Sequence, residues 1–212
     1  MEEPPSDPSA SRARVVVLAG PSGSGKTRLA GRLHTAYGWP IVRLDNFYRD
    51  GDDPALPIQA SLGIPDWDDP RSWHAEAALE ALATLIETGH ARTPVYDLAQ
   101  SRATGFEEVV CESGRLILAE GIFAAEIIGA LHQRGLLHSA WCLVQGRKRT
   151  FVRRLARDLA ERRKPPGVLL QRGRALYAGE PATIRRQVAL GARQARPREV
   201  ERILGTDAAA LG

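Results

Sequence analysis

Residues 20–27 read Gly-Pro-Ser-Gly-Ser-Gly-Lys-Thr, which fits the pattern G-x-x-x-x-G-K-[ST] of a phosphate-binding loop. The loop lies between a β-branched run, Arg14–Ala19, and an amphipathic pattern from Lys26 to Tyr37 that Gly38 closes. This context is what the motif requires, because the glycines let the backbone N–H groups converge on phosphate oxygens at the start of a helix. The sequence therefore predicts a nucleoside triphosphate site.

Each part of this loop is expected to have its own role. The Lys26 ammonium would reach the β- and γ-phosphates, and the Thr27 hydroxyl would be a ligand of Mg²⁺. ATP and Mg²⁺ are therefore the expected cofactors. The other loop residues expected to contact the nucleotide are Gly20, Ser22, Gly23, Ser24 and Gly25.

Several classes of P-loop protein lack their signatures in this chain. Guanine-specific GTPases generally carry N-K-x-D, but the only asparagine is Asn46, which Phe47 follows. No D-x-x-G sequence follows the P-loop, and the L-S-G-G-Q signature of transporter ATPases is absent. The chain is also short for a helicase core. A small-molecule kinase remains.

The composition is that of a globular protein of one mid-sized domain, with 212 residues, 43% apolar and 25% charged. The longest apolar runs, such as Val15–Ala19 and Leu116–Ala119, fall far short of the roughly 18 residues that span a bilayer. No secretory signal opens the chain. We therefore expect a cytoplasmic protein without a membrane partner, with a disordered lead-in at 1–12 and one domain at 13–212.

The charge is unevenly distributed along the chain. Residues 1–110 hold 10 basic and 16 acidic side chains, whereas residues 111–212 hold 19 basic and 9 acidic ones. A basic half is compatible with nucleic acid or with a small polyphosphate ligand. The charge alone does not decide between them. Cys111 and Cys142 are expected to be small buried residues rather than a disulfide or metal ligands.

Apolar runs that alternate with helical patterns favour an α/β fold, a three-layer P-loop NTPase with a parallel sheet of about five strands and a helical lid at about 148–165. Asp69 is expected to cap a helix that Pro70 opens and that runs to about Thr88. Helices are also expected at 124–134, 148–163, 168–178 and 182–191. The expected strands are Arg14–Ala19, Pro40–Leu44, Thr93–Tyr96, Arg115–Ala119 and Ala140–Val144.

Two carboxylates follow expected strands at the edge where a parallel sheet binds ligands. Asp45 follows one strand, where a kinase needs a carboxylate to orient and deprotonate the attacking hydroxyl. Glu120 ends another, buried strand, and an unpaired carboxylate there would be costly. Its position therefore argues for a nearby cation.

A series of motifs in residues 14–165 resembles the uridine kinases, in a branch of the actinobacterial type. After the P-loop they are Leu44-Asp-Asn-Phe-Tyr48, Trp67-Asp-Asp-Pro70, Pro94-Val-Tyr-Asp97, Leu118-Ala-Glu-Gly-Ile122 and Arg153-Arg-x-x-Arg157-Asp-x-x-Glu-Arg162.

The resemblance implies a role for each matching residue. Asp45 would be the catalytic base, and Glu120 would help to hold Mg²⁺. Asp68 would bind two ribose hydroxyls. The other substrate-binding positions would be Tyr48, Trp67, Tyr96 and Arg102, and the lid arginines over the triphosphate would be Arg154, Arg157 and Arg162.

The chain departs from the family pattern after Tyr96. Uridine kinases usually continue Tyr-Asp through a His to Ser/Thr-Arg, and that His reads the pyrimidine. Here the run to Arg102 is one residue shorter and holds Gln100 instead. The expected function is phosphorylation of the 5′-hydroxyl of a ribonucleoside such as uridine or cytidine. The expected partner is a small-molecule substrate rather than a nucleic acid, and a homo-oligomer is compatible with this expectation. The alternatives are a kinase of a vitamin precursor or sugar, or an ATP-binding regulatory module that contacts nucleic acid.

Overall fold

The computed structural model describes residues 13–59, 63–112, 114–146 and 179–211. The expected lead-in at 1–12, the lid at 148–165 with its arginines, and the helix at 168–178 lie outside these residues.

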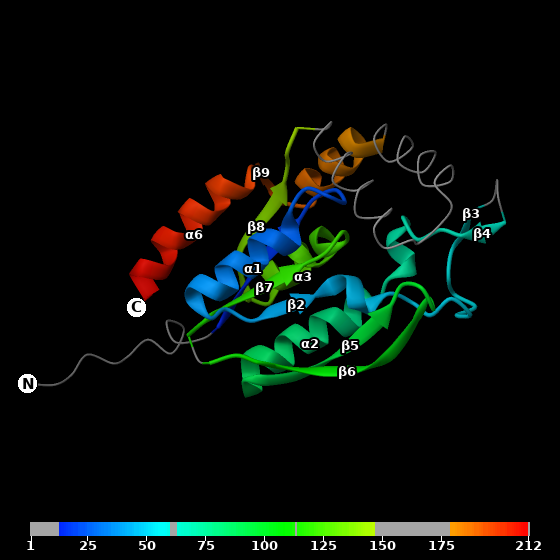
Figure 1. The fold of residues 1–212 in the computed structure, drawn as a ribbon, viewed down its shortest axis with the longest axis horizontal. Helices are drawn as coiled ribbons and strands as arrows, with labels where there is room; N and C mark the ends of the chain where they lie inside the picture. The colour runs from blue at the N-terminus through cyan, green and yellow to red at the C-terminus, as the bar shows by residue number, and fades with distance from the viewer. Residues whose placement is uncertain (1–12, 60–62, 113, 147–178, 212) are drawn as a thin grey trace, which may run out of the picture.

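A five-stranded parallel sheet forms the centre of the fold (Figure 1). The expected parallel sheet is thus confirmed. All five residues of the strand Leu116–Glu120 are buried, and the first four form the continuous apolar run that is typical of a strand covered on both faces. In spatial order the strands are β2 (Ile41–Arg43), β7 (Leu116–Glu120), β1 (Arg14–Ala19), β8 (Leu137–Leu143) and β9 (Arg193–Ala195).

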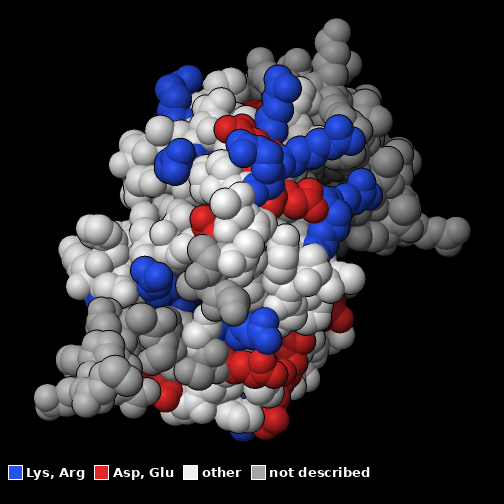
Figure 2. Space-filling model, turned by 90° about the vertical axis from the view of Figure 1, so that its left-hand side faces the viewer, with Lys and Arg blue, Asp and Glu red and all other residues white. Residues whose placement is uncertain are grey.

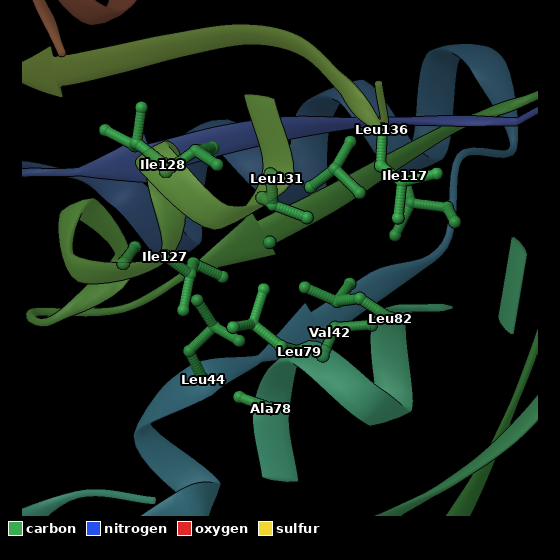
Figure 3. Close-up of a cluster of buried hydrophobic side chains, with 14 of the residues drawn as sticks. Val42, Leu44, Ala78, Leu79, Leu82, Ile117, Ile127, Ile128, Leu131 and Leu136 are labelled. Atoms are coloured by element: carbon green, nitrogen blue, oxygen red, sulfur yellow. The ribbon is translucent and has the colours of Figure 1, made fainter. Parts of the chain in front are cut away.

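Alternate side chains of the central strands pack into separate layers on the two faces of the sheet. Val16 and Leu18 of β1 belong to a core with α1 (Lys26–Tyr37) and α6 (Pro197–Leu211). The intervening residues of β1 belong to the opposite core, with α2 (Ala75–Thr88), the 3₁₀ helix η3 (Ala124–Ile127) and α3 (Ile128–Gln133). Figure 3 shows Leu79 and Leu82 of α2 beside Val42, with residues of η3 and α3 across from them.

The expected strand at Thr93–Tyr96 belongs to a different structure from the one predicted. It is part of β5 (His90–Asp97), which pairs antiparallel with β6 (Arg102–Val110) in a separate hairpin. The fifth strand of the main sheet is β9, which the sequence analysis missed. Two of the three β9 residues are exposed, so this strand has no apolar run to identify it.

The helix after Asp69 also begins later than predicted. The Asp69 side chain accepts a hydrogen bond from the Arg71 N–H, but it caps only the short 3₁₀ helix η2 (Pro70–Ser72). Trp73 is then extended, because it forms a β-bridge with Tyr48 and donates its indole N–H to the Leu44 carbonyl. The α-helix therefore starts only at Ala75.

Other expectations from the sequence are close to the structure. The helix Lys26–Tyr37 has the predicted bounds, and Gly38 ends it in a left-handed conformation. The helix expected at 124–134 is split into η3 and α3, and the one expected at 182–191 is helical from the first described residue of this part of the chain, 179, to 189. The β3 (Ile58–Gln59) and β4 (Ile64–Pro65) strands form a small hairpin. Within the described ranges, no helix combines the length and apolar character that crossing a bilayer demands.

Candidate active site

The P-loop connects β1 to α1 at the carboxyl edge of the sheet, where its glycines are needed for two reasons. Gly20, Gly23 and Gly25 all have positive φ, which side chains rarely allow. A Cβ on Gly20 would also lie 2.6 Å from the Leu143 carbonyl oxygen. The loop can therefore turn tightly against the end of β8 only with glycine at these positions.

The Lys26 ammonium is held over this loop. Lys26 is buried, with 7% of its surface exposed, and its Nζ donates to the carbonyls of Gly20 at 2.9 Å and Pro21 at 3.3 Å. A buried ammonium needs such oxygen partners, because an unpaired charge is costly away from water. The cation is thus positioned at the start of α1, where phosphate oxygens are favoured.

Thr27 and Glu120 meet beside the P-loop. The Thr27 Oγ1 donates to the two Glu120 carboxylate oxygens at 3.1 and 3.2 Å. Burial is the main cause that raises the pKa of Glu120, and Asp45 raises it further, while Lys26 opposes both. A hydroxyl next to a buried carboxylate is a donor set that suits Mg²⁺, which takes oxygen ligands and usually retains several waters.

The Asp45 carboxylate lies against the loop that follows β7. Asp45 is in the 3₁₀ helix η1 (Leu44–Phe47), whose Leu44 and Phe47 side chains are buried and leave Asp45 exposed. Its Oδ1 accepts a hydrogen bond from the Ile122 N–H at 2.8 Å. Strand register explains why Asp45 lies near Glu120, because Arg43 at the end of β2 pairs with Glu120 of β7. Asp45, Glu120 and Lys26 therefore occupy one edge of the sheet.

Gln145 also contacts the P-loop, and the sequence analysis did not single it out. It lies two residues beyond β8, and its Nε2 donates to the Ser24 carbonyl at 2.7 Å. A Cβ on Gly25 would come within 2.9 Å of the same nitrogen. The sequence signal that could have identified Gln145 is its position, as a polar residue just past an expected strand. Its hydrogen bond connects the P-loop to β8, a second strand of the sheet.

An aromatic cluster includes three of the residues that the family resemblance assigns to the substrate. The ring centroids of Tyr48 and Trp67 are 5.8 Å apart, and those of Tyr48 and Tyr96 are 5.9 Å apart. Phe123, which lies just after Ile122, adds a fourth ring 5.8 Å from Tyr48. The Tyr96 hydroxyl donates to the Arg49 carbonyl at 2.9 Å, and burial raises its pKa to about 12.

Tyr96 lies in a different sheet from the one that the sequence suggested. It was expected to end a strand of the parallel sheet, but it lies inside the antiparallel hairpin, whose strand β5 contacts η1. Asp68 follows Trp67 in an exposed loop, and the Tyr48 hydroxyl donates to the Trp67 carbonyl at 3.3 Å. Arg102 is exposed at the start of β6.

The Gln100 side chain is engaged within the turn of the hairpin. Its Nε2 donates to the Asp97 Oδ2 at 2.8 Å, while the Asp97 Oδ1 accepts from the N–H groups of Ala99 and Gln100. These contacts hold the pKa of Asp97 below its usual value. The Gln100 amide, which this run holds instead of the histidine, thus stabilises a local turn.

A cavity of about 750 Å³ lies on the side of Tyr48 toward α2 and the β5–β6 hairpin. Tyr48 is the only one of the five expected substrate-binding residues that lines it. The cavity is therefore not formed by those five residues together. Within the described parts of the chain, no group of three or more His, Cys, Asp or Glu side chains has the arrangement of a metal site.

The basic residues are interspersed with acidic ones on the face of the molecule in Figure 2. Lys and Arg side chains gather in one half of this face with Asp and Glu between them, and acidic side chains gather in the other half. Some basic residues are paired, as where Arg32 of α1 donates to the Glu201 carboxylate of α6 at 2.6 and 2.9 Å. This face is not a continuous basic surface.

Comparison with known proteins places the chain among kinases. The profile of the phosphoribulokinase/uridine kinase family matches residues 15–169. A uridine kinase of Deinococcus deserti is 29% identical over 163 residues, which cover 74% of each chain. A uridine kinase of Lactobacillus johnsonii is 26% identical and covers 70% of this chain and 69% of its own. A crystal structure described as a fructose transport system kinase from Silicibacter sp. TM1040 has a TM-score of 0.61 at 20% identity, over 91% of both chains, and shares the fold.

Proposed function

This chain belongs to the phosphoribulokinase/uridine kinase family, and on that premise we propose that its acceptor is the 5′-hydroxyl of a ribonucleoside such as uridine or cytidine. Membership makes the chain an ATP-dependent kinase that transfers phosphate to an alcohol. The proposal adds the acceptor and the roles of the individual residues.

One observation carries the assignment of roles: three charged groups meet at the carboxyl edge of the sheet. Lys26 lies over the phosphate loop, Glu120 contacts Thr27, and Asp45 is fixed by the Ile122 N–H at 2.8 Å. Phosphoryl transfer needs a cation beside the phosphates and a carboxylate beside the attacking hydroxyl. This arrangement supports both requirements.

In the proposed step, Asp45 orients the acceptor hydroxyl and takes its proton. The hydroxyl oxygen forms a bond to the γ-phosphorus as the bond to the β,γ-bridging oxygen breaks, and ADP leaves with that electron pair. Lys26 and the N–H groups of the P-loop stabilise the charge on the phosphate oxygens. Thr27 and Glu120 are the residues that would hold Mg²⁺, which would neutralise part of the same charge when bound.

The aromatic cluster is proposed to form the wall of the acceptor site. Tyr48, Trp67 and Tyr96 offer ring faces that suit a nucleobase or a sugar. Asp68 would accept hydrogen bonds from both ribose hydroxyls, which a carboxylate can do with its two oxygens. Arg102 completes this proposed set. The arginines at 154, 157 and 162 are proposed to close over the triphosphate.

The proposal is tested by measuring ATP consumption with a panel of alcohols. Uridine and cytidine are expected to turn over, and phosphorus NMR should identify the product as a 5′-monophosphate. 2′-Deoxyuridine should bind more weakly, because it lacks one partner of Asp68. Asp68→Asn should weaken uridine binding far more than ATP binding. Equal binding of uridine and 2′-deoxyuridine would contradict the proposed role of Asp68.

A sugar acceptor is the second candidate, because Gln100 is engaged by Asp97 rather than available to read a pyrimidine. The Silicibacter structure, described as a fructose transport system kinase, has the same fold over nearly the whole chain. The panel therefore includes fructose and pantothenate. Turnover of fructose without turnover of any nucleoside would replace the first proposal. A nucleic-acid-binding module would instead show steeply salt-dependent RNA or DNA affinity without turnover of any alcohol.

A further inference from the structure

Gln187 is a buried polar residue for which neither the phosphate loop nor the proposed acceptor site accounts. It lies in the helix at residues 179–189, and only 3% of its surface is exposed. A buried amide is retained at low cost only if its donors and acceptors are paired. Its partners therefore indicate what the residue does.

The Gln187 amide connects β8, an inner strand of the sheet, to the loop after β7. Its Oε1 accepts a hydrogen bond from the Cys142 thiol, with 3.2 Å between the heavy atoms. Its Nε2 donates to the Ile122 carbonyl oxygen at 3.0 Å. Burial raises the pKa of Cys142 to about 11, so the thiol keeps its proton at neutral pH and can donate. These two partners fix the orientation of the amide.

Ile122 is also the residue that holds Asp45. Its N–H donates to Asp45 Oδ1 at 2.8 Å, and its carbonyl accepts from Gln187. The main chain of Ile122 is thus held at both ends, by side chains from distant parts of the chain. The neighbouring Gly121 allows this approach, because a Cβ there would lie 2.8 Å from Asp45 Oδ1.

We propose that Gln187 is a positioning residue that fixes the Asp45 carboxylate through the main chain of Ile122. The inference rests on the proposed role of Asp45 as the catalytic base. Gln187 does not touch the reacting groups. It restrains the loop whose N–H orients the base, and displacement of a reacting group by about 1 Å can cost about 100-fold in rate.

The test uses Gln187→Met, which keeps the length and apolar packing of the side chain but removes both hydrogen bonds. Arg186→Met is the matched control from the same helix. Arg186 pairs with Glu126 of η3 at 3.0 Å, so its loss also weakens the docking of this helix without touching Ile122. If Gln187→Met does not fold, Gln187→Asn carries the same test, because its side chain is one methylene too short to reach both partners.

The first measurement is independent of activity. In ¹H–¹⁵N spectra of the full chain, assigned with Ile122→Val, Gln187→Met should move the Ile122 amide resonance and speed its hydrogen exchange at least about 10-fold. Arg186→Met should leave this amide unchanged. An unchanged Ile122 amide in folded Gln187→Met would overturn the inference, whatever the fate of the proposed function.

The second measurement is a double-mutant cycle on kcat, with uridine as the probe acceptor. Gln187→Met should lower kcat about 10-fold or more while the KM for ATP stays within about twofold. In an Asp45→Asn background the same change should cause no further loss, because the group that it positions is gone. A full additional loss in that background would refute the positioning role. Wild-type turnover by Asp45→Asn would instead refute the proposed base, and the amide measurement would still decide the role of Gln187.

Discussion

The Thr27 hydroxyl donates to both oxygens of the Glu120 carboxylate, at 3.1 and 3.2 Å, across 93 positions of the chain. The pair joins the first turn of α1 to the last residue of β7, and 5% of the surface of Glu120 is exposed. A carboxylate buried in this way is retained at a cost to stability. That cost is understandable if the site holds a cation.

Glu120→Gln is expected to stabilise the metal-free protein and to abolish turnover. The raised pKa of Glu120 means that the folded chain disfavours the ionised carboxylate. Ionisation of Glu120 therefore lowers the stability of the fold as the pH rises above 4.5, the pKa of this group in the unfolded chain. Glutamine can still accept from Thr27 without that charge. At pH 7 the Tm should rise by roughly 2–4 °C, which is the shift for about 1 kcal/mol in a domain of this size. Thermal unfolding checks the change, and a lower Tm would contradict it.

Lys26→Ala should reduce kcat at least about 100-fold, because it removes charge stabilisation of several kcal/mol from the phosphates. Arg28→Ala is the matched control, since Arg28 is an exposed cation two residues further along the same helix. Steady-state kinetics of ATP consumption distinguish the two. Near-wild-type turnover by Lys26→Ala would refute the role of this lysine.

Gly121→Ala should lower kcat about 10-fold or more with little change in the KM for ATP, because the new methyl group would displace the Asp45 carboxylate or the backbone beside it. Gly129→Ala in α3 is the control, since a Cβ there meets nothing within 4 Å. Kinetics and thermal unfolding of both variants check this. Equal effects of the two substitutions would show that the loss is unrelated to Asp45.

Tyr96→Phe should raise the KM for the acceptor severalfold and leave the KM for ATP unchanged. The Tyr96 hydroxyl holds the hairpin to the Arg49 carbonyl. Loss of this hydrogen bond makes the aromatic side of the proposed acceptor site less rigid and leaves the P-loop contacts intact. Initial-rate measurements with each substrate varied in turn test this split. A parallel rise in both KM values would indicate a general loss of structure instead.

The two thiols should resist modification in the folded chain. Burial raises the pKa values of Cys111 and Cys142 to about 11, so at pH 8 only about one in a thousand is a thiolate. In the unfolded chain the two thiols have pKa values near 9, so between pH 9 and 11 they ionise only when the chain unfolds. The stability of the folded chain should therefore fall as the pH rises from 9 toward 11. Reaction with a maleimide, with and without denaturant, gives the comparison. Rapid modification without denaturant would disprove the prediction.

The local elements near the P-loop were predictable because their signals are contained in short stretches. The run Arg14–Ala19, the loop and the helix to Tyr37 have the predicted bounds, since β-branched residues, glycines and apolar periodicity act within a few residues. The burial of both cysteines is confirmed as well. By contrast, β9 has an exposed pattern and depends on its pairing with β8.

The sequence by itself determined the nucleotide loop, the α/β class and the family, because each rests on patterns within short stretches and on the order of those stretches along the chain. Only the tertiary structure decided which distant groups meet. Strand register brings Glu120 to Thr27, the turned hairpin brings Tyr96 to Tyr48, and Gln187 reaches Ile122 across 65 positions. Such contacts depend on packing between whole elements, which leaves no pattern in any single stretch of sequence.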